Sequence, residues 1–488
     1  MLNHFNLTDE PWIPIVGKEP ISLKQLFSSP AAEYPELGGN PIQKIALTKL
    51  LLAIAQSAYT PEDEDSCQDM GVEGLANHCL TYLDKWYDTF WLYGEKPFLQ
   101  MPEIRKAKVE GKTTGPYLYA VFPDIATGNN VVFYQKEIKR NLSNAEKALL
   151  IVTLMGFALG TKAIDNKVSL SPDYKKKDTC KPGPGIGRGY LHNLVIGSNI
   201  QETLWINLLT HQQLKKQKSW STGLGVAPWE CMPNGEDCSI ARELKESYLG
   251  RLVPLSRFCL LSQEGLHYSE GIRFSSHKEG GVDPSVAIDR SKKAWKAAWV
   301  DPEKRPWRMI PSFLSYLGKT KSSSFDCIFI KEGLARVKHL PVFGIWSGGL
   351  RVSSNAGEQY VSGSDDFVES KIFLSMEIIG NDEWFWQIEE EIQFLDDLSK
   401  TLYASVSGYY RQLKASGSNH ARISANLFWQ LSEKHSQELF KIKTPKNLRK
   451  QFKSIAMSIY DHLCPKETAR QISSWVNNRS KFHKNRIL

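Results

Sequence analysis

The chain has 488 residues, of which 41% are hydrophobic and 23% charged, and its formal net charge is +8. This composition excludes a disordered chain, and the length predicts two to four domains. The first residues contain no export signal, and the longest apolar run, residues 148–159, is too short to span a bilayer. We therefore expect a cytoplasmic protein without a membrane segment.

The first 375 residues mix helical and strand-like segments. Asn40 is a helix cap ahead of Pro41, and Ser143 forms a capping box with Glu146. Helices are expected at residues 41–59, at residues 74–93 and from residue 143. Strands are expected at residues 130–133, 325–330 and 340–344. Long polar loops separate these elements, so we predict a large, irregular α+β domain over residues 1–375.

Residues 376–488 carry four amphipathic segments. Apolar residues recur at helical spacing from Ile388 to Leu413, Gly417 ends this helix, and Ser418 or Asn419 can cap the next. The apolar stripes of the next three helices are Ile423, Leu427, Leu431 and Leu439, then Leu448, Phe452, Ile455, Ile459 and Leu463, then Ala469, Ile472 and Val476. Short connections between such helices predict an antiparallel four-helix bundle.

The predicted bundle carries the positive charge of the protein. From residue 401 to the end there are 16 Lys and Arg against 4 Asp and Glu, whereas residues 1–400 have a net charge of −4. A concentrated basic face is typical of a protein that binds a polyanion, and the alternative is a solvated, lysine-rich surface. The cations expected to face outward and to bind DNA without sequence preference are Lys441, Lys443, Lys446, Arg449, Lys450 and Lys453.

The sequence contains no catalytic motif that we recognise. It lacks a phosphate-binding loop, a zinc-protease motif and a nucleophile elbow, and its 11 histidines are isolated. The acidic residues 389–391 and 396–397 lie on the long predicted helix, where they are expected to form a solvated face. We therefore predict a binding protein rather than an enzyme, although residues distant in sequence can still converge in a fold.

The eight cysteines are scattered and form no Cys-x-x-Cys pair. In a chain without an export signal, free buried thiols are expected. The closest pair is Cys231 and Cys238, and a zinc site there would need two more ligands, such as Cys259 and His267. We predict no metal and no cofactor.

Two basic loops have the composition of nucleic-acid contacts. In residues 175–189 the glycines allow the backbone to approach a ligand closely, and the alternative is a flexible linker. In residues 289–296 a cluster of cations surrounds Trp295, and the alternative is a charged hairpin turn. The candidate DNA-binding residues in these loops are Gly183, Gly185, Gly187, Arg188, Gly189, Arg290, Lys292 and Lys293.

A third loop, residues 347–366, is rich in small polar residues and contains Arg351. Ser, Asn and Gln side chains can pair with base edges, and a compact loop can insert into a duplex. The alternative is a surface loop without function.

With these loops in place, the chain resembles the family of CasA, the large subunit of the type I-E CRISPR surveillance complex. The most distinctive segments are residues 348–351 (GGLR) and 357–367 (GEQYVSGSDDF). Further similar segments are residues 5–15, 47–59, 86–90 and 96–101, followed by the closing helical bundle. The resemblance therefore runs nearly from end to end.

The resemblance implies that guide RNA reads the target by base pairing, while the protein reads a short protospacer-adjacent motif in duplex DNA and helps to open the strands. It implies a glycine loop at residues 183–189, a basic finger at residues 290–293, and a loop contacting the complex near the RNA at Phe133, Tyr134 and Gln135. The wedge that enters the duplex would consist of Arg351, Val352, Ser353, Ser354 and Asn355. Val352, Ser353 and Ser354 depart from the amide side chains that the wedge of the best-known member uses.

The implied partners are other subunits of the complex, the guide RNA, target DNA and a helicase–nuclease. Two other functions stay open from the residues alone. One is an RNA-binding scaffold of another ribonucleoprotein, whose basic bundle lies on structured RNA. The other is a nuclease that uses dispersed carboxylates.

Overall fold

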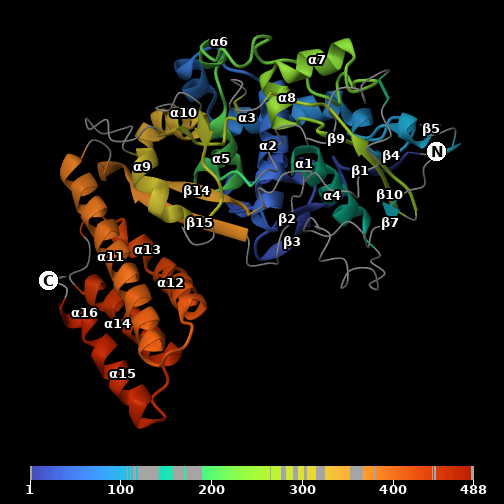
Figure 1. The fold of residues 1–488 in the computed structure, drawn as a ribbon. Coiled ribbons are helices and arrows are strands. Elements are labelled where there is room, and N and C mark those ends of the chain that lie inside the picture. Colours follow the sequence, from blue (N-terminus) through green and yellow to red (C-terminus); the bar gives the residue numbers. More distant parts are fainter. Residues whose placement is uncertain are drawn as a thin grey trace. The chain divides into compact units, whose positions relative to one another are not determined.

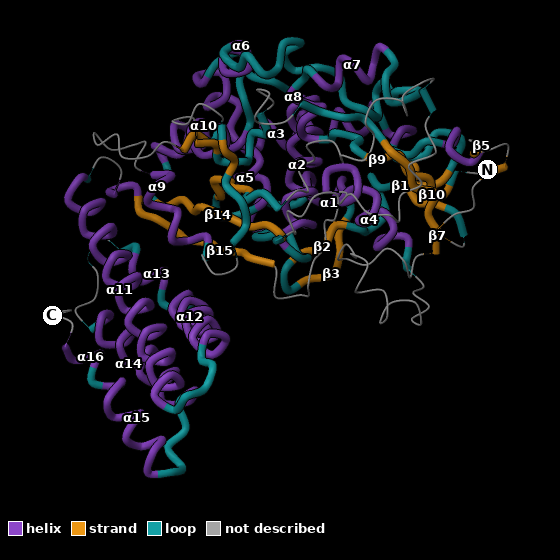
Figure 2. Tube along the Cα trace, in the orientation of Figure 1, coloured by secondary structure: helices purple, strands orange, loops and turns teal. Residues whose placement is uncertain are grey.

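The computed structural model describes residues 3–106, 108–109, 112–113, 117–118, 142–157, 170–171, 189–263, 265–275, 282–289, 295–301, 305–314, 325–351, 367–378, 381–441, 443 and 447–484. The chain divides into two compact units (Figure 1). Unit 1 comprises Met1–Val300, Asp326–Val337 and Gly348–Val368, and unit 2 comprises Asp301–Phe325, Lys338–Ser347 and Glu369–Leu488. Unit 1 mixes helices and strands, and unit 2 is mainly helical (Figure 2). The predicted α+β class with a C-terminal helical bundle is confirmed.

Unit 1 surrounds its core with helices and short strands. Its helices are α1 (Leu23–Ser28), α2 (Pro41–Ala58), α3 (Glu64–Lys85), α4 (Asn144–Phe157), α5 (Ile200–Asn207), α6 (His211–Lys215), α7 (Ser239–Lys245), α8 (Tyr248–Leu252) and α10 (Ile328–Arg336). Helix α2 is buried along most of its length and contacts α3, α4, α5 and α8, so it forms the centre of this unit.

The strands in the described residues have two to six residues each, except β14 and β15 with nine. They are β1 (His4–Asn6), β2 (Ile13–Ile15), β3 (Lys18–Ile21), β4 (Trp91–Tyr93), β5 (Lys108–Val109), β6 (Lys112–Thr113), β7 (Tyr117–Leu118), β8 (His192–Ile196), β9 (Arg257–Leu261), β10 (Gly265–Glu270), β11 (Ile288–Asp289), β12 (Lys296–Ala297), β13 (Phe325–Asp326), β14 (Val342–Leu350) and β15 (Phe367–Ser375). Antiparallel pairs join β1 to β4, β2 to β3, β5 to β6, β10 to both β7 and β9, and β11 to β12.

Two helix starts in unit 1 confirm the predicted caps. The side chain of Asn40 accepts a hydrogen bond from the Gln43 backbone, and Pro41 is the first residue of α2. Ser143 and Glu146 form the expected reciprocal pair, with the Ser143 amide 2.7 Å from the Glu146 carboxylate. One face of the apolar run in α4 is buried, as expected for a helix that packs on the core, whereas Leu149, Leu150 and Leu154 are half-buried.

Other predictions in unit 1 were wrong in part. Helix α3 begins at Glu64 rather than near residue 74, because Asp63 caps it, and Gly71 at φ +63° then interrupts its geometry. Residues 328–330 belong to a helix rather than to the predicted strand. The strand predicted at residues 340–344 begins at Val342. The strand predicted at residues 130–133 lies outside the described residues.

The buried guanidinium of Arg336 joins three helices of unit 1. It donates hydrogen bonds to the carbonyl oxygens of Trp205, Ile206 and Leu208, at 2.9, 3.1 and 2.6 Å. These carbonyls lie at the end of α5, where helical partners are missing. The same group pairs with Glu64 of α3 at 2.7 Å, so one side chain of α10 fixes the ends of two neighbouring helices.

Unit 2 contains the bundle. Its helices are α9 (Ile310–Leu314), α11 (Asp382–Gln412), α12 (Ser418–Glu433), α13 (Ser436–Leu439), α14 (Leu448–Leu463), α15 (Ala469–Arg479) and α16 (Lys481–Lys484). The long helix α11 packs against α12, α14 and α15, as predicted for one long amphipathic helix within a bundle. Residues 301–325 and 338–347 also belong to this unit, so it includes chain well before residue 376.

The end of α11 differs from the prediction. The helix stops at Gln412, and Lys414 adopts the left-handed conformation with φ +59°, a position where glycine is usual. The Lys414 and Ala415 amides donate to the carbonyls of Arg411 and Tyr410. Gly417 is instead the cap residue of α12, so Ser418 begins that helix rather than capping it.

The apolar stripes predicted for α12 and α15 are not their buried faces. Ile423 and Leu431 of α12 are exposed, as are Ile472 and Val476 of α15. The buried residues are Ala421, Ser424, Phe428, Trp429 and Ser432 of α12, and Ser474 and Asn478 of α15. These predictions were wrong because the helices dock through small, polar and aromatic side chains, which a hydrophobic period does not detect.

The contact between α11 and α15 shows how polar residues replace an apolar stripe. Ser474 donates to the Tyr409 carbonyl at 2.9 Å, and the Asn478 amide donates to Gln412 at 3.2 Å. A Cβ atom on Gly408 would lie 2.2 Å from the Asn478 side-chain oxygen. The missing side chain at Gly408 therefore allows the two helices to approach, and hydrogen bonds fix their register.

Among the helices that the structure describes, none combines the length and the apolar character needed to cross a membrane.

Candidate nucleic-acid interfaces

Many of the predicted contact residues lie outside the described part of the chain. They are Phe133, Tyr134, Gln135, Gly183, Gly185, Gly187, Arg188, Arg290, Lys292, Lys293, Val352, Ser353, Ser354, Asn355 and Lys446. The described members are Gly189, Arg351, Lys441, Lys443, Arg449, Lys450 and Lys453. Residues next to each predicted DNA loop are nevertheless described. We call them the loop anchors: Gly189 for the glycine loop, Asp289 and Lys296 for the finger, and Gly349 for the wedge. All of them belong to unit 1.

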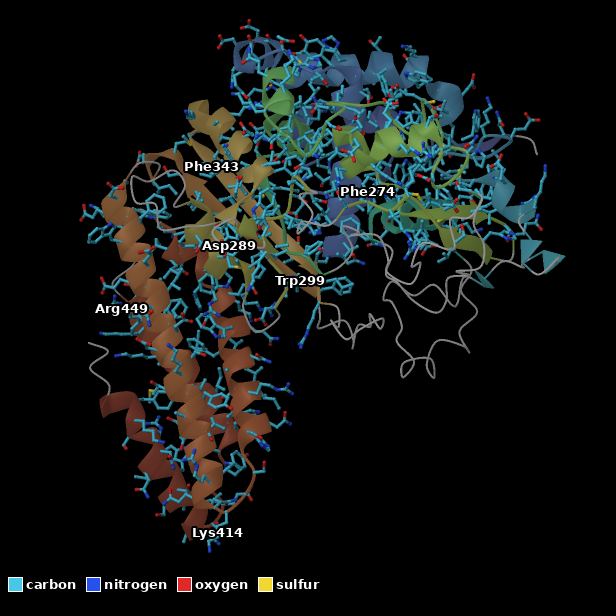
Figure 3. All side chains as sticks on the ribbon, turned by 45° about the horizontal axis from the view of Figure 1, so that its top comes forward. Phe274, Asp289, Trp299, Phe343, Lys414 and Arg449 are labelled. Carbon is cyan, nitrogen blue, oxygen red and sulfur yellow. The ribbon has the colours of Figure 1, made fainter. Side chains whose placement is uncertain are left out.

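The predicted basic finger connects two paired strands. Strands β11 and β12 are antiparallel, with Ile288 opposite Ala297 and Asp289 opposite Lys296. Asp289 is labelled in Figure 3. Residues 290–293 lie outside the described residues, between β11 and β12 in the chain, and we call this strand pair the hairpin. The strand pairing fixes the chain on both sides of these residues, which is compatible with the predicted finger and with its alternative, a charged turn.

The glycine loop ends beside this hairpin. The carbonyl of Gly189, which has φ +72°, accepts a hydrogen bond from the Val300 amide at 2.7 Å. The Leu191 amide donates to the Ala298 carbonyl at 2.9 Å, and Tyr190 and Trp299 form a β-bridge between these contacts. The residues that follow the glycine loop, 189–191, are thus paired through their backbones with residues 298–300, which follow the finger.

The predicted wedge begins at the same place. A Cβ atom on Gly349 would lie 2.6 Å from the Tyr190 carbonyl oxygen and 2.6 Å from Cγ2 of Val300. Only glycine allows this approach, because a side chain would overlap backbone. Arg351, two residues further on, is exposed. The structure therefore brings together the anchors of the glycine loop, the finger and the wedge around Tyr190 and Val300.

Trp299 lies at this junction and was missed by the sequence analysis. Its indole is 49% exposed, and its ring centroid is 4.8 Å from that of the nearly buried Tyr190. Figure 3 labels Trp299 on unit 1. The available signal was the spacing Trp295-x-x-x-Trp299 directly after the basic cluster. That signal was weak, because most tryptophans are core residues.

A buried charged network supports the same region. Lys49 of α2 donates to both carboxylate oxygens of Asp283, at 2.8 and 2.6 Å, and both side chains are almost completely buried. The Ser285 hydroxyl donates to Asp283 at 2.7 Å and lies 2.7 Å from Nδ1 of His192. The network joins the central helix to β8, which follows the glycine loop, and to the segment that leads into β11.

The pKa of Asp283 is lowered in this network. Burial alone would raise it, but the charges of Lys49 and His192 and the hydrogen bonds from Lys49 and Ser285 outweigh that effect. Asp283 is therefore a carboxylate throughout the range in which the protein is expected to work. A buried pair of this kind is costly to break, because either partner alone would be an uncompensated charge.

The contact of Ser285, His192 and Asp283 does not have the arrangement of a hydrolytic triad. In a triad the histidine lies between serine and carboxylate, whereas here the serine hydroxyl lies between the other two. The exposed fractions of Ser285, His192 and Asp283 are 0%, 0% and 3%, so a substrate cannot reach them. We assign these residues to the support of the loop anchors.

The cysteines proposed as possible zinc ligands have other surroundings. Cys238 caps α7, accepting a hydrogen bond from the Ala241 amide at 3.4 Å, while Cys231 is exposed. Cys259 is buried in β9, where burial raises the pKa of its thiol. No cluster of three or more His, Cys, Asp or Glu side chains suited to a metal ion occurs within the described ranges.

In unit 2, the prediction that Arg449 is an outward-facing free cation was wrong. Its guanidinium pairs with Glu390 and Glu391, each at 2.8 Å, and lies 5.0 Å from the ring centre of Phe394. Hydrogen bonding to Glu391 is the main reason why its pKa is raised. The positive charge of Arg449 is therefore largely balanced within the bundle. Figure 3 labels this residue on the helical unit.

The acidic residues of α11 were predicted to form a solvated face, and this prediction was wrong in part. Glu391 is buried, and Asp396 forms an ion pair with Arg308. The guanidinium of Arg308 also lies 3.7 Å from the ring centre of Trp429. These contacts tie the segment before α9 to α11 and α12, within unit 2.

The remaining described cations of the predicted basic face differ in exposure. Lys441, Lys443 and Lys450 are exposed, as predicted. Lys453 is half-buried, with its ammonium 6.0 Å from the ring centre of Phe394. An accessible basic surface is therefore present, but it is smaller than the sequence suggested.

Comparison with known proteins identifies similar chains. A curated CRISPR-associated protein CasA/Cse1 of Thermus thermophilus is 26% identical over 225 residues, a match that spans 43% of this chain and 40% of the relative. The crystal structure of Thermobifida fusca Cse1 matches with a TM-score of 0.71 and 18% identity, covering 98% of this chain and 97% of that one. A chain of a CRISPR RNA-guided surveillance complex matches with a TM-score of 0.69 and 14% identity, covering 98% and 99%.

The structural matches establish a shared fold over nearly the whole chain. The family model described as CRISPR-associated protein Cse1 matches residues 6–462, which include the three loop anchors and most of the bundle. This chain belongs to the CRISPR-associated Cse1 family, also called CasA.

Proposed function

We propose that this protein is the large subunit of an RNA-guided type I-E CRISPR surveillance complex, that it recognises a short motif in duplex DNA, and that it helps to open the strands. The observation that carries the proposal is the convergence of three loop anchors on Tyr190 and Val300. Membership of the Cse1 family supports it. The partners would be other subunits, the guide RNA and the target DNA.

The proposed division of labour follows from the chemistry of the loops. Glycine backbone and the cations Arg290, Lys292 and Lys293 would contact the minor groove, whose pattern of donors and acceptors is degenerate. Several related motifs should therefore be tolerated. Insertion of residues 351–355 would unstack a base step at a cost of a few kcal/mol, which pairing of guide and target then offsets.

The bundle would bind the displaced strand without sequence preference. Its exposed lysines suit phosphate contacts, whose strength falls steeply as salt rises. The same subunit would also help to recruit the helicase–nuclease that degrades the DNA. We propose binding rather than catalysis for this chain, because the described Ser–His–Asp contact is sealed from solvent and wrongly ordered for hydrolysis.

The test is a gel-shift titration with the reconstituted complex and motif-bearing duplex DNA. Replacing Arg290, Lys292 and Lys293 by Gln should weaken binding by about tenfold or more. The matched control replaces three exposed lysines of the same unit, Lys215, Lys216 and Lys218, by Gln. That variant removes the same charge and should bind nearly as the wild type does.

Two outcomes would contradict the proposal. If both triple variants lose affinity equally, the finger has no special role and the attraction is general. If the wild-type complex binds RNA hairpins more tightly than duplex DNA at matched salt, the chain is an RNA-binding scaffold.

A further inference from the structure

We propose that Trp299 is a stacking site for an unpaired nucleobase of the target DNA. The inference rests on the proposed function and adds a residue and a ligand class to it. Four observations lead to it: the exposure of the indole, its rigid support, its position among the loop anchors, and the chemistry of an exposed aromatic face.

Of the tryptophans, which all lie in the described residues, only Trp299 and Trp386 are exposed. Trp12, Trp307 and Trp384 are 0–2% exposed, whereas Trp299 is 49% exposed. A large apolar side chain contributes to stability mainly when water is excluded from it, so leaving half of an indole in water sacrifices part of that gain. A binding role explains why tryptophan occupies this position.

The indole is held in place before any ligand arrives. The backbone on either side is fixed, because the Ala298 amide donates to Ala287 at 2.8 Å and the Val300 amide donates to Gly189 at 2.7 Å. On one side the ring contacts Tyr190, which is only 6% exposed, at an interplanar angle of 54°. Such a preorganised ring loses little conformational entropy on binding, which favours affinity.

The position of Trp299 selects the ligand. It adjoins Val300, where the anchors of the glycine loop, the finger and the wedge meet. In intact duplex DNA each base face is covered by its neighbours, so an indole finds no free face there. Strand separation exposes base faces, and an aromatic ring can stack on any of them. An unpaired base at the point of opening is therefore the ligand that this ring suits.

The surroundings suit a nucleic acid rather than an apolar peptide. Lys296 and Arg351 are both exposed. Lys296 lies in β12, three residues before Trp299, and Arg351 lies two residues after Gly349 of the wedge anchor. Cations beside an aromatic platform are the usual combination in proteins that bind single strands, since they contact phosphates while the ring contacts bases.

The experiment compares three replacements of Trp299 in the reconstituted complex. Trp299→Ala and Trp299→Leu should lower affinity for motif-bearing duplex roughly 5- to 100-fold, the range expected for one stacked base. Leucine keeps an apolar contact with Tyr190 but has no aromatic face, so it separates stacking from packing. Trp299→Phe should retain most of the affinity. Melting temperatures of the variants check that each one is folded.

The matched control is Trp386→Ala. Trp386 is also an exposed tryptophan, at 68%, but it lies on α11 in unit 2 and away in sequence from the three loops. Its removal should leave affinity within twofold of the wild type. A similar loss in both variants would show that exposed tryptophans contribute non-specifically, and would overturn the inference.

A second DNA distinguishes stacking from strand opening. A duplex with a two-nucleotide mismatch beside the motif already has unpaired bases, so a stacking role predicts that Trp299→Ala loses affinity for it as well. Full recovery of binding on the mismatched DNA would mean that Trp299 acts by forcing the strands apart, and the inference would fail.

The two proposals fail in different ways. If the wild-type complex does not distinguish motif-bearing duplex from other DNA, the proposed function is wrong, and this inference falls with it. If the wild type does distinguish them but all three Trp299 variants bind equally well, only the stacking role is wrong.

Discussion

The loop anchors of unit 1 and the basic bundle of unit 2 hold their charges in opposite ways. At the loop anchors of unit 1, the ion pair of Lys49 and Asp283 is almost completely buried. In the bundle the ionic groups lie on helix surfaces, and several cations are paired with carboxylates or packed on aromatic rings. The comparison shows that the net charge of a region does not tell how many of its charged groups are accessible to a binding partner, or where in the structure those groups lie.

The bundle illustrates this for individual cations. Arg479 pairs with Asp461 at 3.1 Å and lies 5.0 Å from the ring centre of Trp475, while Lys466 lies 4.5 Å from the same ring. These groups contribute to the excess of basic residues, yet they act within the fold. The accessible charge of the bundle is therefore lower than its formal charge.

The largest expected effect tests the buried pair. Asp283→Asn should lower the free energy of unfolding by about 3–5 kcal/mol, because it leaves the Lys49 ammonium buried without a counter-charge. Urea unfolding measures this loss. The control is Glu62→Gln, which breaks the exposed pair with Lys215 and should cost less than about 1 kcal/mol. Equal losses would contradict the structural role of the buried pair.

The same variant has a pH signature. Since the pKa of Asp283 is lowered in the fold, its carboxylate adds stability that is fully present above about pH 5. This stability begins to decline near the ordinary carboxyl pKa of about 4 and is lost progressively as the pH falls toward the lowered pKa of the folded state. The stability difference between the wild type and Asp283→Asn should therefore shrink between pH 5 and pH 3. A difference that stays constant over this interval would mean that Asp283 is not ionised.

The next effect tests the junction itself. Gly349→Ala places a Cβ atom against the Tyr190 carbonyl and Val300, so it should cost about 1–3 kcal/mol and also weaken DNA binding. The control is Gly71→Ala, where a Cβ meets nothing within 4 Å and only backbone strain of about 1–2 kcal/mol applies. Thermal unfolding and gel-shift titration together separate them, because only Gly349→Ala should change affinity.

A smaller effect tests which cations of the bundle reach DNA. Replacing Lys441, Lys443 and Lys450 by Gln should weaken non-specific binding about tenfold and reduce the slope of log affinity against log salt by roughly 2–3. Arg449→Gln should barely change that slope but should cost stability, since Glu391 would lose its partner. A large slope change for Arg449→Gln would mean that the ion pairs open on binding.

The smallest effect concerns the end of α11. Lys414→Gly should raise the free energy of unfolding by about 0.5–1 kcal/mol, because glycine adopts the left-handed conformation of Lys414 without steric cost. The same replacement at Lys400, which is exposed in the middle of the helix, should lower it by about 1 kcal/mol. A loss of stability in both variants would contradict the left-handed geometry at Lys414.

The helix caps could be predicted because their chemistry is local. Asn40 with Gln43 and Ser143 with Glu146 satisfy backbone amides within a single turn, so the sequence contains the whole interaction. The helical faces were less predictable. Ile472 and Val476 form an apolar pair at helical spacing, yet α15 docks through Ser474 and Asn478. That outcome depends on Gly408 and Gln412 of another helix.

The sequence alone determined three features of this protein: the mixed fold with a helical bundle, the excess of basic residues near the C-terminus, and the resemblance to the Cse1 family. These features depend on composition, periodicity and residue order. Only the tertiary structure brought Gly189, Val300 and Gly349 together, paired Lys49 with Asp283 and left Trp299 half exposed. These contacts join residues that are distant in the chain. They form because core packing brings segments together, which no local pattern encodes.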